Sequence, residues 1–125
     1  MPKVLLIEDE ESLRNLYTKG LVNCDFKVET ATDGGDALIK LTQYKPDVIV
    51  LDIVMPNMDG MEVLKIIKND PKLKRIPVLM LTSVTKINKM KQCLEMGAMG
   101  YVTKGNSSEE IVQRVNLILG SFNGH

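Results

Sequence analysis

The sequence predicts a doubly wound α/β fold, in which a five-stranded parallel sheet carries five helices on its two faces. Short apolar runs recur along the 125 residues, and three of them lack the polar–apolar alternation of a half-exposed strand. Such runs are typical of parallel strands that are covered on both faces. Segments with apolar residues at helical spacing separate the runs, so the chain consists of five successive strand–helix units. Right-handed crossovers then distribute the helices over both faces of the sheet.

The expected strands fall into two kinds. Residues 4–7, 48–51 and 78–81 are continuously apolar, which suits the middle of a sheet. Residues 27–30 alternate between polar and apolar side chains, and residues 100–103 are less apolar than the central runs. We therefore expect the second and fifth strands to lie at the edges of the sheet.

The helices are predicted from apolar stripes and from residues typical of helix ends. Asp59 with Glu62 has the spacing of an N-terminal capping box, and so does Ser107 with Glu110. Gly97 is placed to end the fourth helix. The five apolar stripes lie within residues 13–21, 37–41, 61–67, 87–94 and 111–119.

The length and composition suit one soluble domain, which we expect to span residues 1–120, followed by a flexible C-terminal tail, 121–125. The formal net charge is +0, so nothing favours direct binding to nucleic acid or to a membrane surface. Cys24 and Cys93 lack the close spacing of metal-binding cysteine pairs, and the single histidine is at the C-terminus. Both observations argue against a zinc or iron–sulfur site. No signal peptide or membrane-length apolar run is present, so we expect a cytoplasmic protein.

The charges are distributed unevenly along the chain. Residues 1–62 contain twelve of the sixteen acidic residues and six basic ones, a net charge of −6, and residues 63–125 carry the balancing +6. Ordinary solvated helix faces account for most of these side chains. The asymmetry is also consistent with an acidic pole that can bind a hard cation.

Chemically active side chains follow four of the expected strands. Glu8 and Asp9 follow the first strand, Asp52 the third, Thr82 the fourth and Lys104 the fifth. In an open parallel sheet, ligands bind beside the carboxyl ends of the strands. Clustered carboxylates repel one another, and a bound cation lets them stay ionised at low cost. An all-oxygen site of this kind favours Mg²⁺ or Mn²⁺.

Each of these residues also has an ordinary structural explanation. Acidic residues are common at a helix N-terminus, and this accounts well for Glu10 and Glu11. Asp52 could cap the following helix, but Asp59 is better placed to do so. Thr82 or Lys104 alone would be unremarkable. Their joint placement at successive strand ends makes the functional interpretation stronger than any one residue does.

Together these residues resemble a known family. Glu8-Asp9, the stretch D-I-V-M-P-N-M-D-G over residues 52–60, Thr82-Ser83, Tyr101 and Lys104 are similar to the receiver domains of response regulators in two-component signal transduction. The resemblance covers nearly the whole chain. It implies a flavodoxin-like fold of the chemotaxis-regulator kind, with the strand order 2-1-3-4-5.

The resemblance also implies a chemical role for each acidic residue. Asp52 would accept a phosphoryl group from a histidine kinase, a phosphotransfer protein or a small phosphodonor. Asp9, Asp52 and the backbone carbonyl of Val54 would coordinate Mg²⁺, or alternatively Mn²⁺, and Glu8 would assist. The chain would therefore be a phosphoacceptor switch whose only chemistry is its own phosphorylation and dephosphorylation, and not an enzyme acting on other substrates.

Three further residues would complete such a switch. By the same resemblance, Lys104 would pair with the phosphoryl oxygens, Thr82 would hydrogen-bond one of them, and Tyr101 would change its position with the modified state. A downstream target or output domain would bind the face formed by the fourth and fifth helices. The chain would be a monomer or a phosphorylation-dependent dimer.

The sequence departs from the family pattern at two places. Most receivers have a proline after the lysine, often preceded by a cis bond, whereas this chain has Gly105, so we expect a trans bond. The residues two positions after Asp52 and after Thr82 are Val54 and Val84. In this family these positions tune the attack of water on the acyl phosphate. Because valine cannot orient a water molecule by hydrogen bonding, we predict a phosphorylated state that lives longer than in members with polar residues at these positions.

Three alternative functions fit the sequence less well. A phosphatase of the dehalogenase type needs a second acid two residues after its nucleophile, where this chain has Val54. A flavin-binding flavodoxin needs a glycine- and hydroxyl-rich loop after the first strand, where residues 8–11 are all acidic. The closer alternative is a receiver that acts as a protein-interaction module without phosphorylation, and the intact set of acids, hydroxyl and lysine argues against it.

Overall fold

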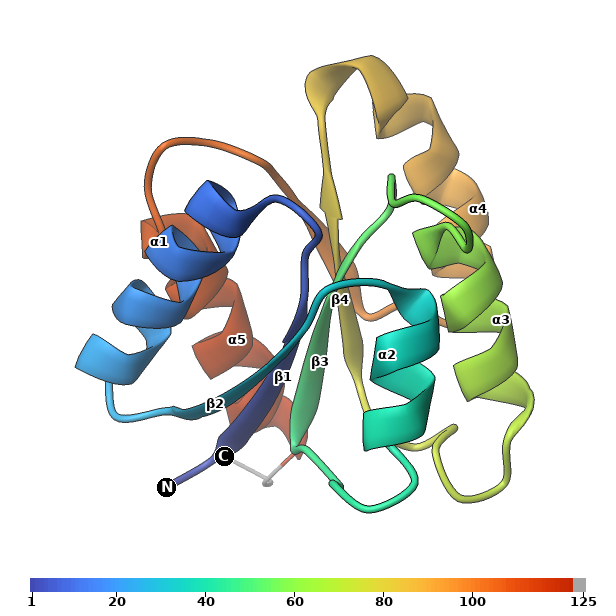
Figure 1. Ribbon diagram of the computed structural model, residues 1–125, viewed down its shortest axis with the longest axis horizontal. Helices are drawn as coiled ribbons and strands as arrows, with labels where there is room; N and C mark the ends of the chain where they lie inside the picture. The colour runs from blue at the N-terminus through green and yellow to red at the C-terminus, as the bar shows by residue number, and fades with distance from the viewer. Residues whose placement is uncertain (123–125) are drawn as a thin grey trace.

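Five parallel strands form one sheet in the order β2-β1-β3-β4-β5 (Figure 1). This arrangement comes from a computed structural model, which describes residues 1–122. The predicted strand order and the edge positions of β2 and β5 are confirmed. The strands are β1 (Lys3–Ile7), β2 (Lys27–Ala31), β3 (Val48–Asp52), β4 (Val78–Thr82) and β5 (Gly100–Thr103).

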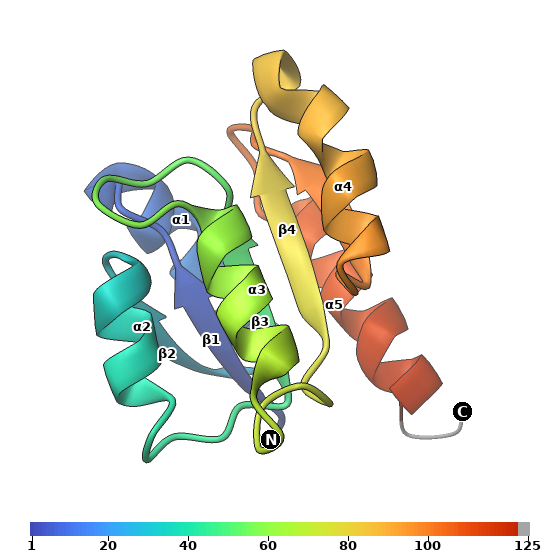
Figure 2. The same ribbon diagram turned by 90° about the vertical axis from the view of Figure 1, so that its right-hand side faces the viewer.

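Helices cover both faces of the sheet. Figures 1 and 2 show α1 and α5 on one face and α2, α3 and α4 on the other. The predicted fourth helix starts differently from expectation, because its first part, Val84–Lys89, is a 3₁₀ segment that leads into a short α-helix. The helices are α1 (Glu11–Asn23), α2 (Gly34–Lys40), α3 (Gly60–Asn69), α4 (Met90–Glu95) and α5 (Glu109–Phe122).

The central strands explain the layered architecture. Successive side chains of a strand point to opposite faces of the sheet. On β1 and β3, Leu5 and Ile49 pack into the core beneath α2, α3 and α4, whereas Val4 and Val48 pack into the core beneath α1 and α5. Every residue of β3 and β4 is buried. A strand of this composition is stable only between two helical layers, which is why the continuously apolar runs occupy the middle.

The helix ends follow the predicted signals with one shift. The Asp59 carboxylate accepts a hydrogen bond from the Glu62 amide at 3.0 Å, as expected of an N-cap. The Ser107 hydroxyl accepts from the amide of Glu109 at 3.1 Å, and not from that of Glu110. Gly97 follows α4 with a φ of +109°, the left-handed conformation that terminates many helices.

Helix α5 runs through Phe122, so it includes the first two residues of the predicted tail. Residues 123–125 lie outside the described part of the chain. Within residues 1–122, no helix has the length and apolar character needed to cross a membrane.

Candidate functional site

The carboxyl edge of the sheet collects the buried polar side chains. Among residues 1–120, the buried polar or charged side chains are Glu8, Asp52 and Thr82, each with 0% exposure. Glu8 directly follows β1, and Asp52 and Thr82 are the last residues of β3 and β4. Since burying a charge without a partner is costly, this edge must supply compensating interactions.

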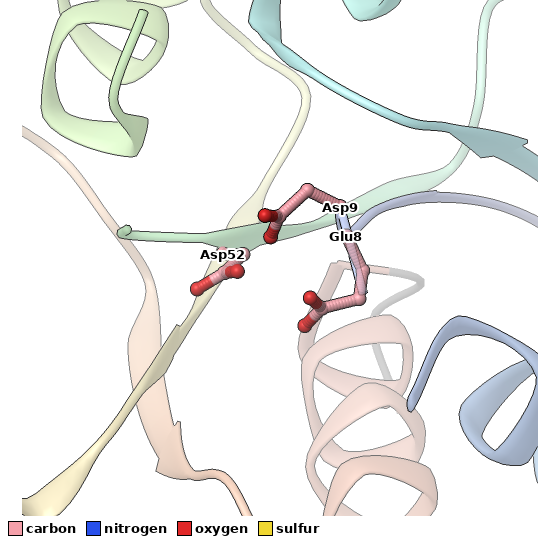
Figure 3. A group of neighbouring side chains, drawn as sticks. All are labelled: Glu8, Asp9 and Asp52. Carbon is pink, nitrogen blue, oxygen red and sulfur yellow. The ribbon is translucent and has the colours of Figure 1, made fainter. Parts of the chain in front are cut away.

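Three carboxylates converge at this edge (Figure 3). One oxygen from each of Glu8, Asp9 and Asp52 lies within 4.8 Å of the others. The adjacency of β1 and β3, which pairs Ile7 with Leu51, brings the two chain segments together. Glu8 and Asp52 are buried, whereas Asp9 is exposed and can reach an incoming ion. The donor set consists of hard oxygen atoms, and it fits Mg²⁺ or Mn²⁺.

Lys104 provides the positive charge for the two buried acids. Its ammonium Nζ lies 2.7 Å from Asp52 Oδ2 and 2.9 Å from Glu8 Oε1. The backbone amide of Lys104 donates to the carbonyl of Thr82 at 2.7 Å, which continues the pairing of β4 with β5 beyond the end of the strand. Residues that are far apart in the sequence therefore form one ion-paired group.

The balance of charge at the site is negative, because one lysine faces three carboxylates. The pKa of Asp52 is raised from 3.8 to about 7, chiefly by burial and also by the neighbouring charge of Glu8, although the Lys104 hydrogen bond and the Val54 amide act to lower it. Burial acts to lower the pKa of Lys104, but its contacts with Asp52 and Glu8 raise it overall. The site thus holds a firmly protonated lysine and favours additional positive charge.

The other acid contacts orient the carboxylates. The backbone amide of Val54 donates to Asp52 Oδ1 at 3.2 Å, and the amide of Glu10 donates to Glu8 Oε2 at 3.0 Å. Arg14 Nη1 donates to the backbone carbonyl of Glu8 at 3.0 Å. Coordination of a metal by the Val54 carbonyl stays a prediction from the family resemblance.

The loop between β3 and α3 must approach the Asp52 backbone closely. A Cβ atom on Gly60 would lie 2.2 Å from the backbone oxygen of Asp52, so this position requires glycine. The Gly60 amide donates to the carbonyl of Ile53 at 2.8 Å. Asn57 has a φ of 68°, a left-handed conformation that asparagine tolerates better than most residues. These contacts fold the loop back toward the acidic cluster.

Thr82 and Tyr101 lie on the adjacent strands β4 and β5. The Thr82 hydroxyl donates to the carbonyl of Ser83 at 2.8 Å, so it is not directed at Asp52 in this conformation. Tyr101 is partly buried, pairs in register with Met80 and packs against the core beneath α2, α3 and α4. Their roles in switching stay predictions. The bond between Lys104 and Gly105 is trans, as expected in the absence of proline.

In the sequence, Tyr17 is notable only as part of the apolar helical stripe within residues 13–21. In the structure its ring is fully buried, and its hydroxyl donates to the backbone carbonyl of Gly105 at 3.0 Å. Gly105 follows Lys104 directly. A tyrosine in a stripe otherwise made of leucines was the available signal, but nothing in the sequence names its partner 88 residues away.

Comparison with known proteins identifies the class of protein that this site and fold define. The sequence profile of the response regulator receiver domain matches residues 4–116. The chain belongs to this family, the receiver domains of two-component systems.

Individual relatives agree with this assignment. The chain is 40% identical over 117 residues to the alkaline phosphatase synthesis transcriptional regulatory protein PhoP of Bacillus subtilis, covering 94% of this chain and 48% of PhoP. It is 36% identical to Protein PilG of Pseudomonas aeruginosa, covering 96% of this chain and 89% of PilG. The structure of the chemotaxis response regulator CheY4 of Vibrio cholerae superposes with a TM-score of 0.87 at 34% identity, covering 94% of this chain and 98% of CheY4. The chain thus spans about half the length of PhoP but most of PilG.

Proposed function

We propose that this receiver domain is a Mg²⁺-dependent switch in which Asp52 accepts a phosphoryl group. The observation that carries the proposal is the position of the Asp52 carboxylate, which lies 2.7 Å from the Lys104 ammonium and within 4.8 Å of the Glu8 and Asp9 carboxylates. In this proposal, the nucleophile lies between the acidic cluster, which would bind the cation, and the positive charge of Lys104.

The chemistry requires that charge repulsion be overcome. A carboxylate oxygen of Asp52 attacks phosphorus, the bond from phosphorus to the donor atom breaks, and the leaving group departs with its electron pair. Lys104 would offset the negative charge of the incoming phosphoryl oxygens, and catalysis of this reaction depends mainly on positioning and electrostatic stabilisation. A divalent ion held by Asp9, Asp52 and the Val54 carbonyl, with Glu8 assisting, would supply further charge neutralisation.

A change of hydrogen-bond partner would convert phosphorylation into a conformational signal. Thr82 now donates to Ser83. A phosphoryl oxygen on Asp52 is a stronger, charged acceptor, and Thr82 would turn toward it. The space released beside β5 would accommodate inward movement of Tyr101, so that a local charge change biases a two-state element.

The partners follow from this role. A sensor histidine kinase or a phosphotransfer domain would supply the phosphoryl group. A downstream target or output domain would bind the face of α4, β5 and α5, where Leu94 of α4 is exposed. PhoP is by its name a transcriptional regulator, so a DNA-binding output could belong to a longer protein, whereas the receiver itself has no net charge to attract nucleic acid.

Incubation with acetyl phosphate and Mg²⁺, followed by intact mass spectrometry, tests the proposal. The wild-type chain is expected to gain one phosphoryl group, and chelation of Mg²⁺ is expected to prevent the gain. Asp52→Asn should abolish it, whereas Asp59→Asn, a control that keeps an N-cap residue outside the acidic cluster, should react like the wild type.

Two results would contradict this function. Incorporation that persists in Asp52→Asn would assign the acceptor to another residue. A folded wild-type chain that takes up no phosphoryl group would favour a phosphorylation-independent interaction module.

A further inference from the structure

The connection between β5 and α5 begins with Lys104, and Gly105 follows it directly. A Cβ atom added to Gly105 would have no atom within 4 Å, so packing does not hold the chain at this point. Glycine also leaves the backbone more conformational freedom than any other residue. The aliphatic stem of Lys104 is itself flexible, yet its ammonium must stay between two buried carboxylates. The loop therefore needs an attachment next to Lys104.

Helix α1 provides this attachment. Tyr17 and Gly20 lie one turn apart on the helix and both face the β5–α5 connection. The Tyr17 hydroxyl donates to the Gly105 carbonyl at 3.0 Å. A Cβ atom on Gly20 would lie 1.9 Å from the Ser108 hydroxyl, which shows how closely α1 and this connection approach each other.

The Tyr17 side chain is held in a fixed position, so its hydroxyl can restrain the backbone that it contacts. Its ring is fully buried in the core formed with α5, among residues that include Leu21 and Val115. A tyrosine side chain has only two rotatable bonds before its ring, so a packed ring holds the hydroxyl in one place. Burial raises the pKa of Tyr17, and the hydroxyl therefore stays protonated and able to donate.

We propose that Tyr17 is a positioning residue for phosphoryl transfer, and that its hydroxyl, by holding the Gly105 carbonyl, keeps the Lys104 ammonium between Asp52 and Glu8. This inference rests on the proposed function of Asp52. Tyr17 does not touch the reacting atoms. It acts through the backbone of the residue that follows Lys104.

Tyr17→Phe removes the hydroxyl and preserves the ring that fills the core. The matched control is Tyr44→Phe, because the Tyr44 hydroxyl is buried without a hydrogen-bond partner among the described residues. In the metal-free protein, amide hydrogen exchange at Lys104, followed by NMR, is expected to accelerate about fivefold in Tyr17→Phe and to stay unchanged in Tyr44→Phe, since a neutral hydrogen bond contributes a free energy equivalent to several-fold in an equilibrium.

The second readout separates positioning from general destabilisation. With saturating Mg²⁺, phosphorylation of Tyr17→Phe by acetyl phosphate is expected to slow roughly three- to tenfold. The dissociation constant for Mg²⁺ should change less than about twofold, because the carboxylates lie on other loops. A Tyr17→Phe variant that matches the wild type in exchange and in rate would overturn the proposal, and so would a parallel loss of rate and Mg²⁺ affinity.

Restricting the loop by another route provides a rescue experiment. Gly105 has a φ outside the left-handed region and room for a Cβ atom, so Gly105→Ala is compatible with the fold and stiffens the backbone. The double variant Tyr17→Phe/Gly105→Ala should regain part of the lost rate, and a failure to regain any would contradict positioning. If the wild-type chain itself takes up no phosphoryl group, the proposed function fails, while hydrogen exchange at Lys104 still reports on whether Tyr17 holds the loop.

Discussion

Ile49, in the middle of β3, and Asp52, at its end, are both fully buried, but they are held by opposite kinds of interaction. Ile49 packs among apolar side chains beneath α2, α3 and α4, and its burial contributes directly to stability. Asp52 lies beside Glu8 and depends on Lys104 for its compensating charge. Two positions three residues apart on one strand therefore have opposite effects, because burial of Ile49 stabilises the fold and burial of Asp52 costs stability.

This difference shows how the domain can be both stable and reactive. The free energy gained by burying apolar side chains in the interior of the sheet offsets the cost of the buried charges at its edge. Removing one partner of a buried ion pair is expensive when it leaves the other charge unpaired. Asp52 shares its lysine with Glu8, so a neutral side chain at position 52 leaves Lys104 paired with Glu8 and removes the repulsion between the two acids. Substitutions in the interior and at the edge should consequently change stability in opposite directions.

The largest effect is expected in the interior. Ile49→Ala removes buried methyl and methylene groups and leaves a cavity, and it should lower the free energy of unfolding by about 3–4 kcal/mol. Urea unfolding followed by circular dichroism measures this change. Ile39→Ala, at a position on α2 that is 71% exposed, serves as the control and should change stability by less than about 0.5 kcal/mol. Equal losses at the two positions would contradict the assigned core.

Mg²⁺ should stabilise the folded domain by binding to the acidic cluster at the carboxyl edge of the sheet. At a Mg²⁺ concentration one hundred times its dissociation constant, the free energy of unfolding is expected to rise by about 2.7 kcal/mol. Asp9→Asn removes an exposed carboxylate of the cluster and should greatly reduce this gain, whereas Asp59→Asn should retain it. Equal stabilisation of wild type and Asp9→Asn would show that Mg²⁺ binds elsewhere.

Asp52→Asn should stabilise the metal-free protein at neutral pH. Burial raises the pKa of Asp52 from 3.8 to about 7, so between these values the folded state binds a proton that the unfolded chain has released. Wild-type stability from this group therefore falls as the pH rises from about 4 to about 7. The advantage of Asp52→Asn should be near zero at pH 4, grow as the pH rises and reach its maximum above pH 7. An advantage that does not depend on pH would refute this electrostatic explanation.

The smallest effect concerns the lifetime of the acyl phosphate. Val54 and Val84 are 51% and 71% exposed near the site, and neither side chain can hydrogen-bond an attacking water. Val54→Asn and Val84→Glu should each accelerate loss of the phosphoryl group by about three- to tenfold, equivalent to roughly 1 kcal/mol in the barrier. The time course of mass loss after removal of the phosphodonor measures this rate. Unchanged rates in both variants would disprove the proposed effect of the two valines.

The sequence by itself determined the layers of this protein and the candidate residues at its strand ends. Continuous apolar runs such as residues 48–51 can be buried only between two helical layers, and alternating residues 27–30 suit an edge. The Asp59 cap and the Gly97 helix end were also predictable, because they depend on residues within a few positions along the chain. The shift from Glu110 to Glu109 at the Ser107 cap shows the limit of such local signals.

Only the tertiary structure decided how the strand-end residues are connected. The contacts of Lys104 with Glu8 and Asp52, and of Tyr17 with Gly105, join residues between 52 and 96 positions apart. Their geometry depends on which strands are neighbours and on the path of the β5–α5 connection. A helical stripe shows that Tyr17 faces the core, but hydrophobic burial has no direction and does not select the acceptor of its hydroxyl. Hydrogen bonds and ion pairs do have geometry, and this geometry exists only once the strands have packed.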